Sequence, residues 1–170
     1  MAYVDDLLLP QISSGDAQRA VGITAPTFKN WSSRKPSVIL LTDREKVEIG
    51  DRVFFNLTLL SVYHLAIVGE FVSLGLTPRK AHLLASALTM RRDGHRQPGM
   101  VFPGGYTYIV GAGNHAFVER GDSNSSVVGI CNRALRAAGR GAVVILNATQ
   151  TIWRTRTALG LEKLTPEERL

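Results

Sequence analysis

Residues 12–35 carry the pattern that decides the fold of the N-terminal half: Ile-Ser-Ser-Gly-Asp-Ala-Gln-Arg-Ala-Val-Gly-Ile-Thr-Ala-Pro-Thr-Phe-Lys-Asn-Trp-Ser-Ser-Arg-Lys. Ser14 is expected to cap a first helix, and Gly22 to end it, because glycine readily takes the left-handed conformation found at helix ends. Thr24 is expected to cap a second helix, with Pro26 in its first turn, where a missing N–H does no harm. The stretch therefore predicts a helix, a tight turn and a second helix.

The second helix divides into an apolar side and a polar side. Phe28 and Trp31 lie three residues apart, so they share a face and can pack on Ala17 and Val21 of the first helix. The remaining side chains are cationic, amide or hydroxyl groups, which reach phosphates and base edges in a DNA major groove. The candidate DNA-contacting residues of this segment are Thr24, Thr27, Lys29, Asn30, Ser33, Arg34 and Lys35.

A β-hairpin is expected over residues 38–55. Val38–Leu41 is a β-type run, and residues 42–46 form a charged tip. Residues 47–49 follow, Gly50 and Asp51 form a turn, and a last β-type run covers residues 52–55. A hairpin directly after such a helix is the wing of a winged helix–turn–helix, although a solvated tip fits the charges equally well. Arg44, Lys46 and Arg52 are its candidate phosphate contacts.

Two further helices are expected after the hairpin. Residues 57–74 are apolar nearly all round, so this helix must be covered on several sides by the rest of the chain or by a second subunit. His64 within it is read as a core or interface histidine. Gly75 ends the helix, and Thr77 caps the next one, whose early residues Arg79 and Lys80 are further candidate DNA contacts.

The sequence from residue 12 to the Leu-Gly-Leu-Thr-Pro turn at residues 74–78 resembles the winged helix–turn–helix domain of MerR-type regulators. The resemblance implies a sequence-specific, double-stranded DNA-binding transcription regulator whose recognition helix spans about residues 24–34. The chain departs from the family after residue 90, because it has neither a long heptad helix nor paired cysteines. The resemblance therefore supports neither dimerisation through such a helix nor metal sensing for this chain.

The polar, basic segment of residues 93–100 is broken by glycine and proline and is interpreted as a linker. It divides the chain into a winged-helix domain at residues 1–92 and a small mixed α/β domain at residues 101–170 with the order β-β-α-β-α. The expected fold class is therefore α+β. The second domain is expected to serve oligomerisation or to bind an effector, RNA polymerase or another protein.

Composition sets limits on the partner and the compartment. A net charge of +6 and a pI near 9.9 favour a polyanionic partner. No acidic residue lies between Asp16 and Asp43, which surrounds the candidate recognition helix with one sign of charge. Cys131 has no possible partner within the chain and is read as a core residue. With no signal peptide or membrane span expected, the predicted location is cytoplasmic and nucleoid-associated.

No catalytic pattern is recognised, so we expect a protein that is not an enzyme and needs no cofactor or metal. The glycines at residues 104, 105, 111 and 113 fit neither a P-loop nor a dinucleotide fingerprint, and the four histidines lack metal-ligand spacing.

Two alternatives stay open beside the transcription regulator. The chain can be an architectural protein acting in recombination, similar to phage excisionases, or a protein-interaction module of its C-terminal half. Because one such domain binds DNA weakly, a homo-oligomer, either a dimer or a cooperative array, is expected. Residues 57–74 or the second half would form its interface.

Overall fold

The computed structural model describes residues 6–91, 96–102, 105–113, 115–122, 124–138 and 142–161. They form six α-helices and two antiparallel three-stranded sheets, which confirms the expected α+β class. The helices are α1 (Ser14–Val21), α2 (Ala25–Ser33), α3 (Leu59–Ser73), α4 (Pro78–Thr89), α5 (Asn124–Ala138) and α6 (Ala148–Ala158). The strands are β1 (Ile12–Ser13), β2 (Lys46–Ile49), β3 (Arg52–Leu57), β4 (Tyr106–Ala112), β5 (His115–Gly121) and β6 (Val143–Asn147), with a 3-10 turn, η1, at Asp43–Glu45.

The first two helices begin and end close to the positions that the sequence predicts. Gly22 ends α1 in the left-handed conformation, with φ of 74°, and the Thr24 side chain caps α2 by accepting from the backbone N–H of Thr27. The cap of α1 is Ser13 rather than Ser14, because the Ser13 hydroxyl accepts from the Asp16 N–H. The predicted cap was therefore wrong by one residue.

The predicted strand at Val38–Leu41 was wrong, and the hairpin is shorter than residues 38–55. Val38 and Ile39 are consecutive and both buried, whereas a half-buried strand would alternate. Their backbone groups also bond elsewhere: Val38 N–H donates to Trp31 O, and Ile39 N–H donates to the Ser37 hydroxyl. The hairpin consists of β2 and β3, and the turn predicted at Gly50 and Asp51 joins them. Residues 42–46 contain η1 and the first residue of β2 and are not a hairpin tip.

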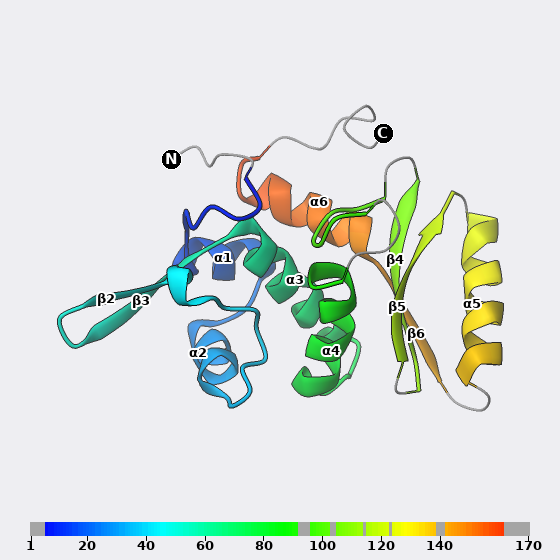
Figure 1. Cartoon of the computed structure of the whole chain (residues 1–170), viewed down its shortest axis with the longest axis horizontal. Helices are drawn as coiled ribbons and strands as arrows, with labels where there is room; N and C mark the ends of the chain where they lie inside the picture. The colour runs from blue at the N-terminus through cyan, green and yellow to red at the C-terminus, as the bar shows by residue number, and fades with distance from the viewer. Residues whose placement is uncertain are drawn as a thin grey trace.

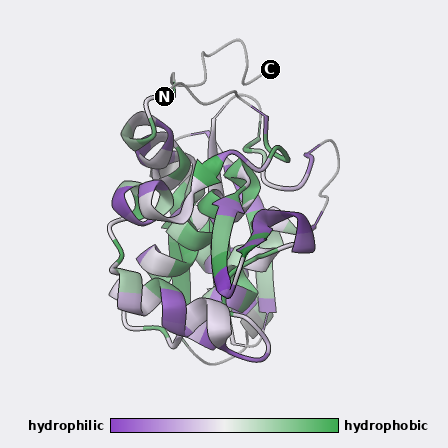
Figure 2. Cartoon of the chain, turned by 90° about the vertical axis from the view of Figure 1, so that its left-hand side faces the viewer, coloured by the Kyte–Doolittle hydropathy of each residue, from purple (hydrophilic) through white to green (hydrophobic). Residues whose placement is uncertain are grey.

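Helix α3 lies at the centre of the molecule, between α1, α4 and α6 (Figure 1). Ten of its residues are buried, and Val62, Ile67 and Phe71 are completely so. One hydrophobic cluster joins them to Ile109 and Ile152 from the second half of the chain. The hydrophobic segments accordingly gather toward the centre of the view in Figure 2. The C-terminal half of the same chain covers α3, so a second subunit is not needed for that purpose.

The second half has the predicted order β-β-α-β-α. Its sheet has the strand order β5-β4-β6, with α5 on one face and α4 and α6 on the other (Figure 1). Helix α4 approaches β4 closely at Gly111, where a Cβ atom would lie 2.8 Å from the Leu84 side chain. Asn147 caps α6 through its side-chain oxygen. Cys131, predicted to be a core residue, is only partly buried on α5.

Arg96 lies within the predicted linker, yet its side chain is 2% exposed. Its guanidinium donates to five backbone carbonyls, which belong to Leu88 (2.8 Å), Arg91 (3.0 Å), Gln97 (3.2 Å), Ala87 (3.3 Å) and Met100 (3.3 Å). The guanidinium carbon also lies 5.8 Å from the centre of the Phe102 ring. A cation at the C-terminal end of α4 satisfies carbonyls that the helix leaves unpaired and complements its dipole. Residues 93–95 lie outside the described part.

Replacing Arg96 tests this arrangement. Arg96→Lys should lower the free energy of unfolding by about 3 kcal/mol, because an ammonium group cannot reach five carbonyls that a planar guanidinium bonds. Urea denaturation measures the loss, and Arg91→Lys at the neighbouring exposed position is the matched control. A change within about 0.5 kcal/mol, as is usual for surface substitutions, would show that the bonds contribute little.

Candidate nucleic-acid interface

Helix α2 is held by its apolar face and presents a polar face to solvent. Phe28 and Trp31 are 4% and 5% exposed, and both belong to the central hydrophobic cluster. The Phe28 ring meets the Phe55 ring of β3 edge to face, with centroids 5.8 Å apart. These two anchors fix the rotation of α2 about its axis, so the side chains at the other positions point outward.

The predicted DNA contacts on and beside α2 differ in their exposure and in the hydrogen bonds that their side chains already make. Lys29, Asn30, Ser33 and Arg34 are exposed. The Thr24 and Thr27 hydroxyls bond each other at 2.9 Å, and the Ser33 hydroxyl donates to Asn30 O at 3.2 Å. Arg34 Nε donates to Asn30 Oδ1 at 3.0 Å. Asn30 therefore can read adenine through both amide atoms only after Arg34 turns away.

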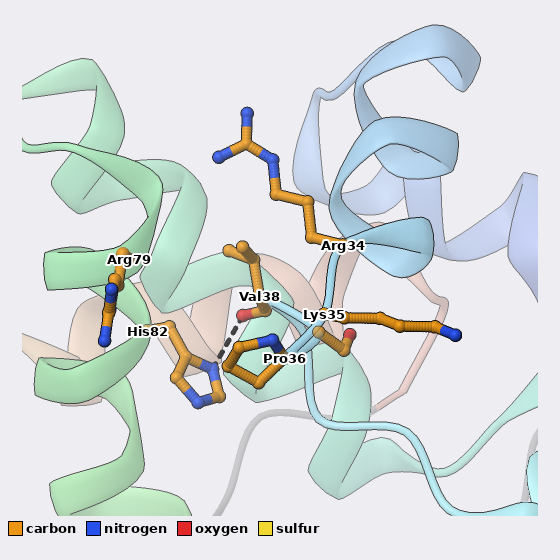
Figure 3. Close-up of a pocket in the computed structure, with 7 residues that line it drawn as sticks. Arg34, Lys35, Pro36, Val38, Arg79 and His82 are labelled. Atoms are coloured by element: carbon orange, nitrogen blue, oxygen red, sulfur yellow. Dashed lines mark hydrogen bonds between the residues drawn. The ribbon is translucent and has the colours of Figure 1, made fainter.

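A cationic pocket lies between the end of α2 and the start of α4 (Figure 3). Its volume is about 240 Å³, and none of its lining residues is acidic. Arg79 and His82 come from α4, and Arg34 stands at the end of α2 on the other side; the Lys35 side chain extends away from Arg79. The lining residues are Arg34, Lys35, Pro36, Ser37, Val38, Arg79 and His82. The fold thus brings together three of the sequence-predicted contacts, Arg34, Lys35 and Arg79.

A chain of hydrogen bonds fixes the floor of this pocket. Thr89 Oγ1 donates to Ala85 O at 3.1 Å, so it accepts from His64 Nδ1 at 2.8 Å. His64 Nε2 then carries a lone pair and can accept a hydrogen bond. His82 Nδ1 is the donor, and it lies 3.0 Å from His64 Nε2 and 2.7 Å from Val38 O. Burial, and secondarily the neighbouring His82, lowers the pKa of His64 to about 3. His64 is a neutral core histidine, as predicted, and it connects α3 to the pocket.

The predicted contacts of the hairpin lie apart from the pocket on a projecting element (Figure 1). Arg44 stands in η1 at its base, and Arg52 lies beside its turn; both are exposed. Lys46 pairs with Glu48 on the same strand, and this hydrogen bond raises the pKa of Lys46 and lowers that of Glu48. A DNA phosphate would therefore compete with Glu48 for the Lys46 ammonium group. Lys80, in the first turn of α4, is exposed but does not line the pocket.

Glu45 was read as part of a polar tip, but its side chain is completely buried. Its carboxylate accepts from the N–H and hydroxyl of Thr42, at 2.7 and 2.9 Å, and from those of Thr58, at 2.7 and 3.0 Å. Thr58 caps α3, so Glu45 joins the base of the hairpin to the central helix. The Thr42-x-x-Glu45 spacing of a capping box was the signal that could have found it. No comparable signal marks the pairing of His82 with His64.

Comparison of the chain with protein-family models, curated proteins and solved structures finds no match. The resemblance to MerR-type regulators therefore stays a prediction from the motif at residues 12–78. Within the described ranges, no three His, Cys, Asp or Glu side chains gather as a metal site would require. The helices described are also too short or too polar to cross a bilayer.

The buried His64 predicts a specific dependence of stability on pH. Its folded pKa of about 3 lies below the ordinary value of 6.5, so between these values only the unfolded chain binds the proton. The stability contributed by neutral His64 is complete above pH 6.5 and is lost as the pH falls toward 3. Between pH 7 and pH 5 this loss should be about 2 kcal/mol.

Urea denaturation of the wild type and of His64→Asn at pH 7 and pH 5 measures this loss. Asn keeps an N–H near the position of Nδ1 but does not titrate, so its unfolding free energy should fall less on acidification. His115→Asn, at an exposed position, is the matched control. Identical pH dependence in wild type and His64→Asn would contradict the assignment.

Proposed function

We propose that the protein binds double-stranded DNA in a sequence-specific manner as a transcription regulator. In this proposal α1 and α2 form a helix–turn–helix, α2 is the recognition helix, and the β2–β3 hairpin is the wing. The observation that carries it is that Arg34 and Arg79, from separate helices, line one pocket without a carboxylate beside the exposed face of α2. The proposed activity is binding without catalysis.

The dimensions and chemistry of α2 suit a major groove. Nine residues at 1.5 Å each give a helix of about 13 Å, and a major groove about 12 Å wide admits a helix of this kind. Lys29 and Arg34 supply the cations that bond guanine or phosphate. Asn30, once released by Arg34, supplies an amide for adenine. The buried Phe28 and Trp31 keep these groups on a rigid element, which a base-reading contact requires.

The pocket supplies contacts of a different kind. Arginine guanidinium groups bond phosphate in bidentate geometry, and Arg34 and Arg79 line opposite sides of the pocket. A backbone phosphate at this position would orient α2 in the groove without reading sequence. The His82 bond to Val38 O supports this arrangement, because it holds the segment that follows Arg34 against α4.

Enrichment from a random pool of DNA duplexes at physiological salt tests the proposal. The wild type should enrich one motif, and the variant Lys29→Ala/Asn30→Ala/Arg34→Ala should bind that motif at least about 100-fold more weakly, since each of the three lost base contacts costs about 1–3 kcal/mol. Arg79→Ala should weaken all duplexes alike and reduce the slope of log K against log salt by about one.

The control variant is Arg120→Ala/Arg136→Ala, which removes two exposed charges from β5 and α5 and should bind as the wild type does. If the folded wild type enriches nothing, or if the control loses as much affinity as the triple variant, the proposal fails.

A further inference from the structure

The β2–β3 hairpin extends away from the body of the molecule and has one unpaired edge (Figure 1). In its sheet β3 lies between β1 and β2, so β2 is an edge strand, and among the described strands only β3 pairs with it. All four residues of β2 are exposed. Gly50, with φ of 59°, and Asp51 form its two-residue turn. An exposed edge of this kind is a template for another strand unless charge, proline or a bulge protects it.

The charges on β2 are complementary to a second copy of the same strand. Lys46 and Glu48 flank Val47. When a copy of the strand lies antiparallel with Val47 opposite Val47, each lysine stands opposite a glutamate. Directly opposed unlike charges stabilise antiparallel pairs, and like charges destabilise them. A register in which Lys46 faced the same residue of a second copy would bring two ammonium groups together.

The backbone favours the same register independently of the charges. The residues that flank a two-residue turn, here Ile49 and Arg52, bond to each other across it. Because backbone groups of a strand alternate in direction, those of Ile49 and Val47 point toward β3, and those of Lys46 and Glu48 point to the free edge. The two residues that carry the complementary charges are therefore also the two whose N–H and C=O groups can bond a new strand.

We propose that the outer edge of β2 pairs antiparallel with β2 of a second copy, Val47 opposite Val47 and Lys46 opposite the partner's Glu48. The contact is self-complementary, so it generates a twofold dimer. It also brings together apolar side chains, because Val47, Ile49 and Phe54, which are 39%, 64% and 48% exposed, lie on one face of the hairpin in the observed register. A four-residue edge is small, so the dimer forms transiently in free solution.

Cysteine cross-linking in a Cys131→Ser background tests the register. In the proposed dimer the two Val47 form a non-hydrogen-bonded pair with Cα atoms about 4.5 Å apart, which suits a disulfide. Val47→Cys should therefore yield a disulfide-linked dimer on mild oxidation. Ile49→Cys is the matched control: it is more exposed on the same strand, but in this register the two copies of residue 49 are about 13 Å apart and should cross-link only at background.

Charge exchange in the Val47→Cys protein tests the complementarity. Lys46→Glu alone, or Glu48→Lys alone, places like charges opposite each other twice and should slow cross-linking roughly fivefold. The exchange Lys46→Glu/Glu48→Lys should restore the rate. Circular dichroism confirms that each variant is folded.

Several results would overturn the proposal: no dimer of folded Val47→Cys, cross-linking of Ile49→Cys as fast as that of Val47→Cys, or failure of the double exchange to restore the rate. If the natural partner of this edge is a strand from another protein, folded Val47→Cys should form no dimer. The experiments contain no DNA, so their failure leaves the proposed DNA binding standing.

Discussion

Helix α3 has no polar face, and this constraint organises the rest of the structure. A helix that is apolar nearly all round must be covered on every side. α1 and α4 cover it from the N-terminal half, and α6 covers it from the C-terminal half. The two halves therefore share one hydrophobic core. The orientation of α2 follows, because Phe28 and Trp31 belong to the same cluster.

Buried polar side chains fix the ends of the helices that this core holds. Glu45 bonds the N–H of Thr58, which caps α3, and the Arg96 guanidinium bonds carbonyls at the end of α4. In both places the buried charge is opposite to that of the nearby end of the helix dipole. His64 fulfils a third such role, since it joins α3 to α4 and, through His82, to the segment after α2. The cationic pocket thus has a rigid wall on each side.

Local patterns in the sequence were sufficient to predict the helices and most of the strands. The caps at Thr24 and Thr77 and the left-handed Gly22 are signals within a few residues, and the structure places each as expected. Val38–Leu41 was mistaken for a strand because β-type residues are equally suitable for a buried loop. Whether such a segment becomes a strand or a buried loop depends on partners distant in the sequence, here Trp31 and His82.

The candidate site was predictable in its residues but not in its geometry. The outward face of α2 follows from the positions of Phe28 and Trp31. The placement of Arg34 and Arg79 along one pocket depends on how α4 packs on α3, which no local pattern encodes. Glu45 and Arg96 were misjudged for the same reason: charged residues in polar segments are usually solvated, and only the tertiary structure shows that these two are buried.

DNA binding is proposed for the face formed by α2 and the start of α4. The most direct test is a titration of the ¹⁵N-labelled protein with a DNA duplex, followed through its backbone amide resonances. The shifts should concentrate at residues 27–38 and 77–82, with α5 unaffected. Shifts confined to α5 and the sheet formed by β4, β5 and β6, or no shifts at any duplex concentration at physiological salt, would contradict it.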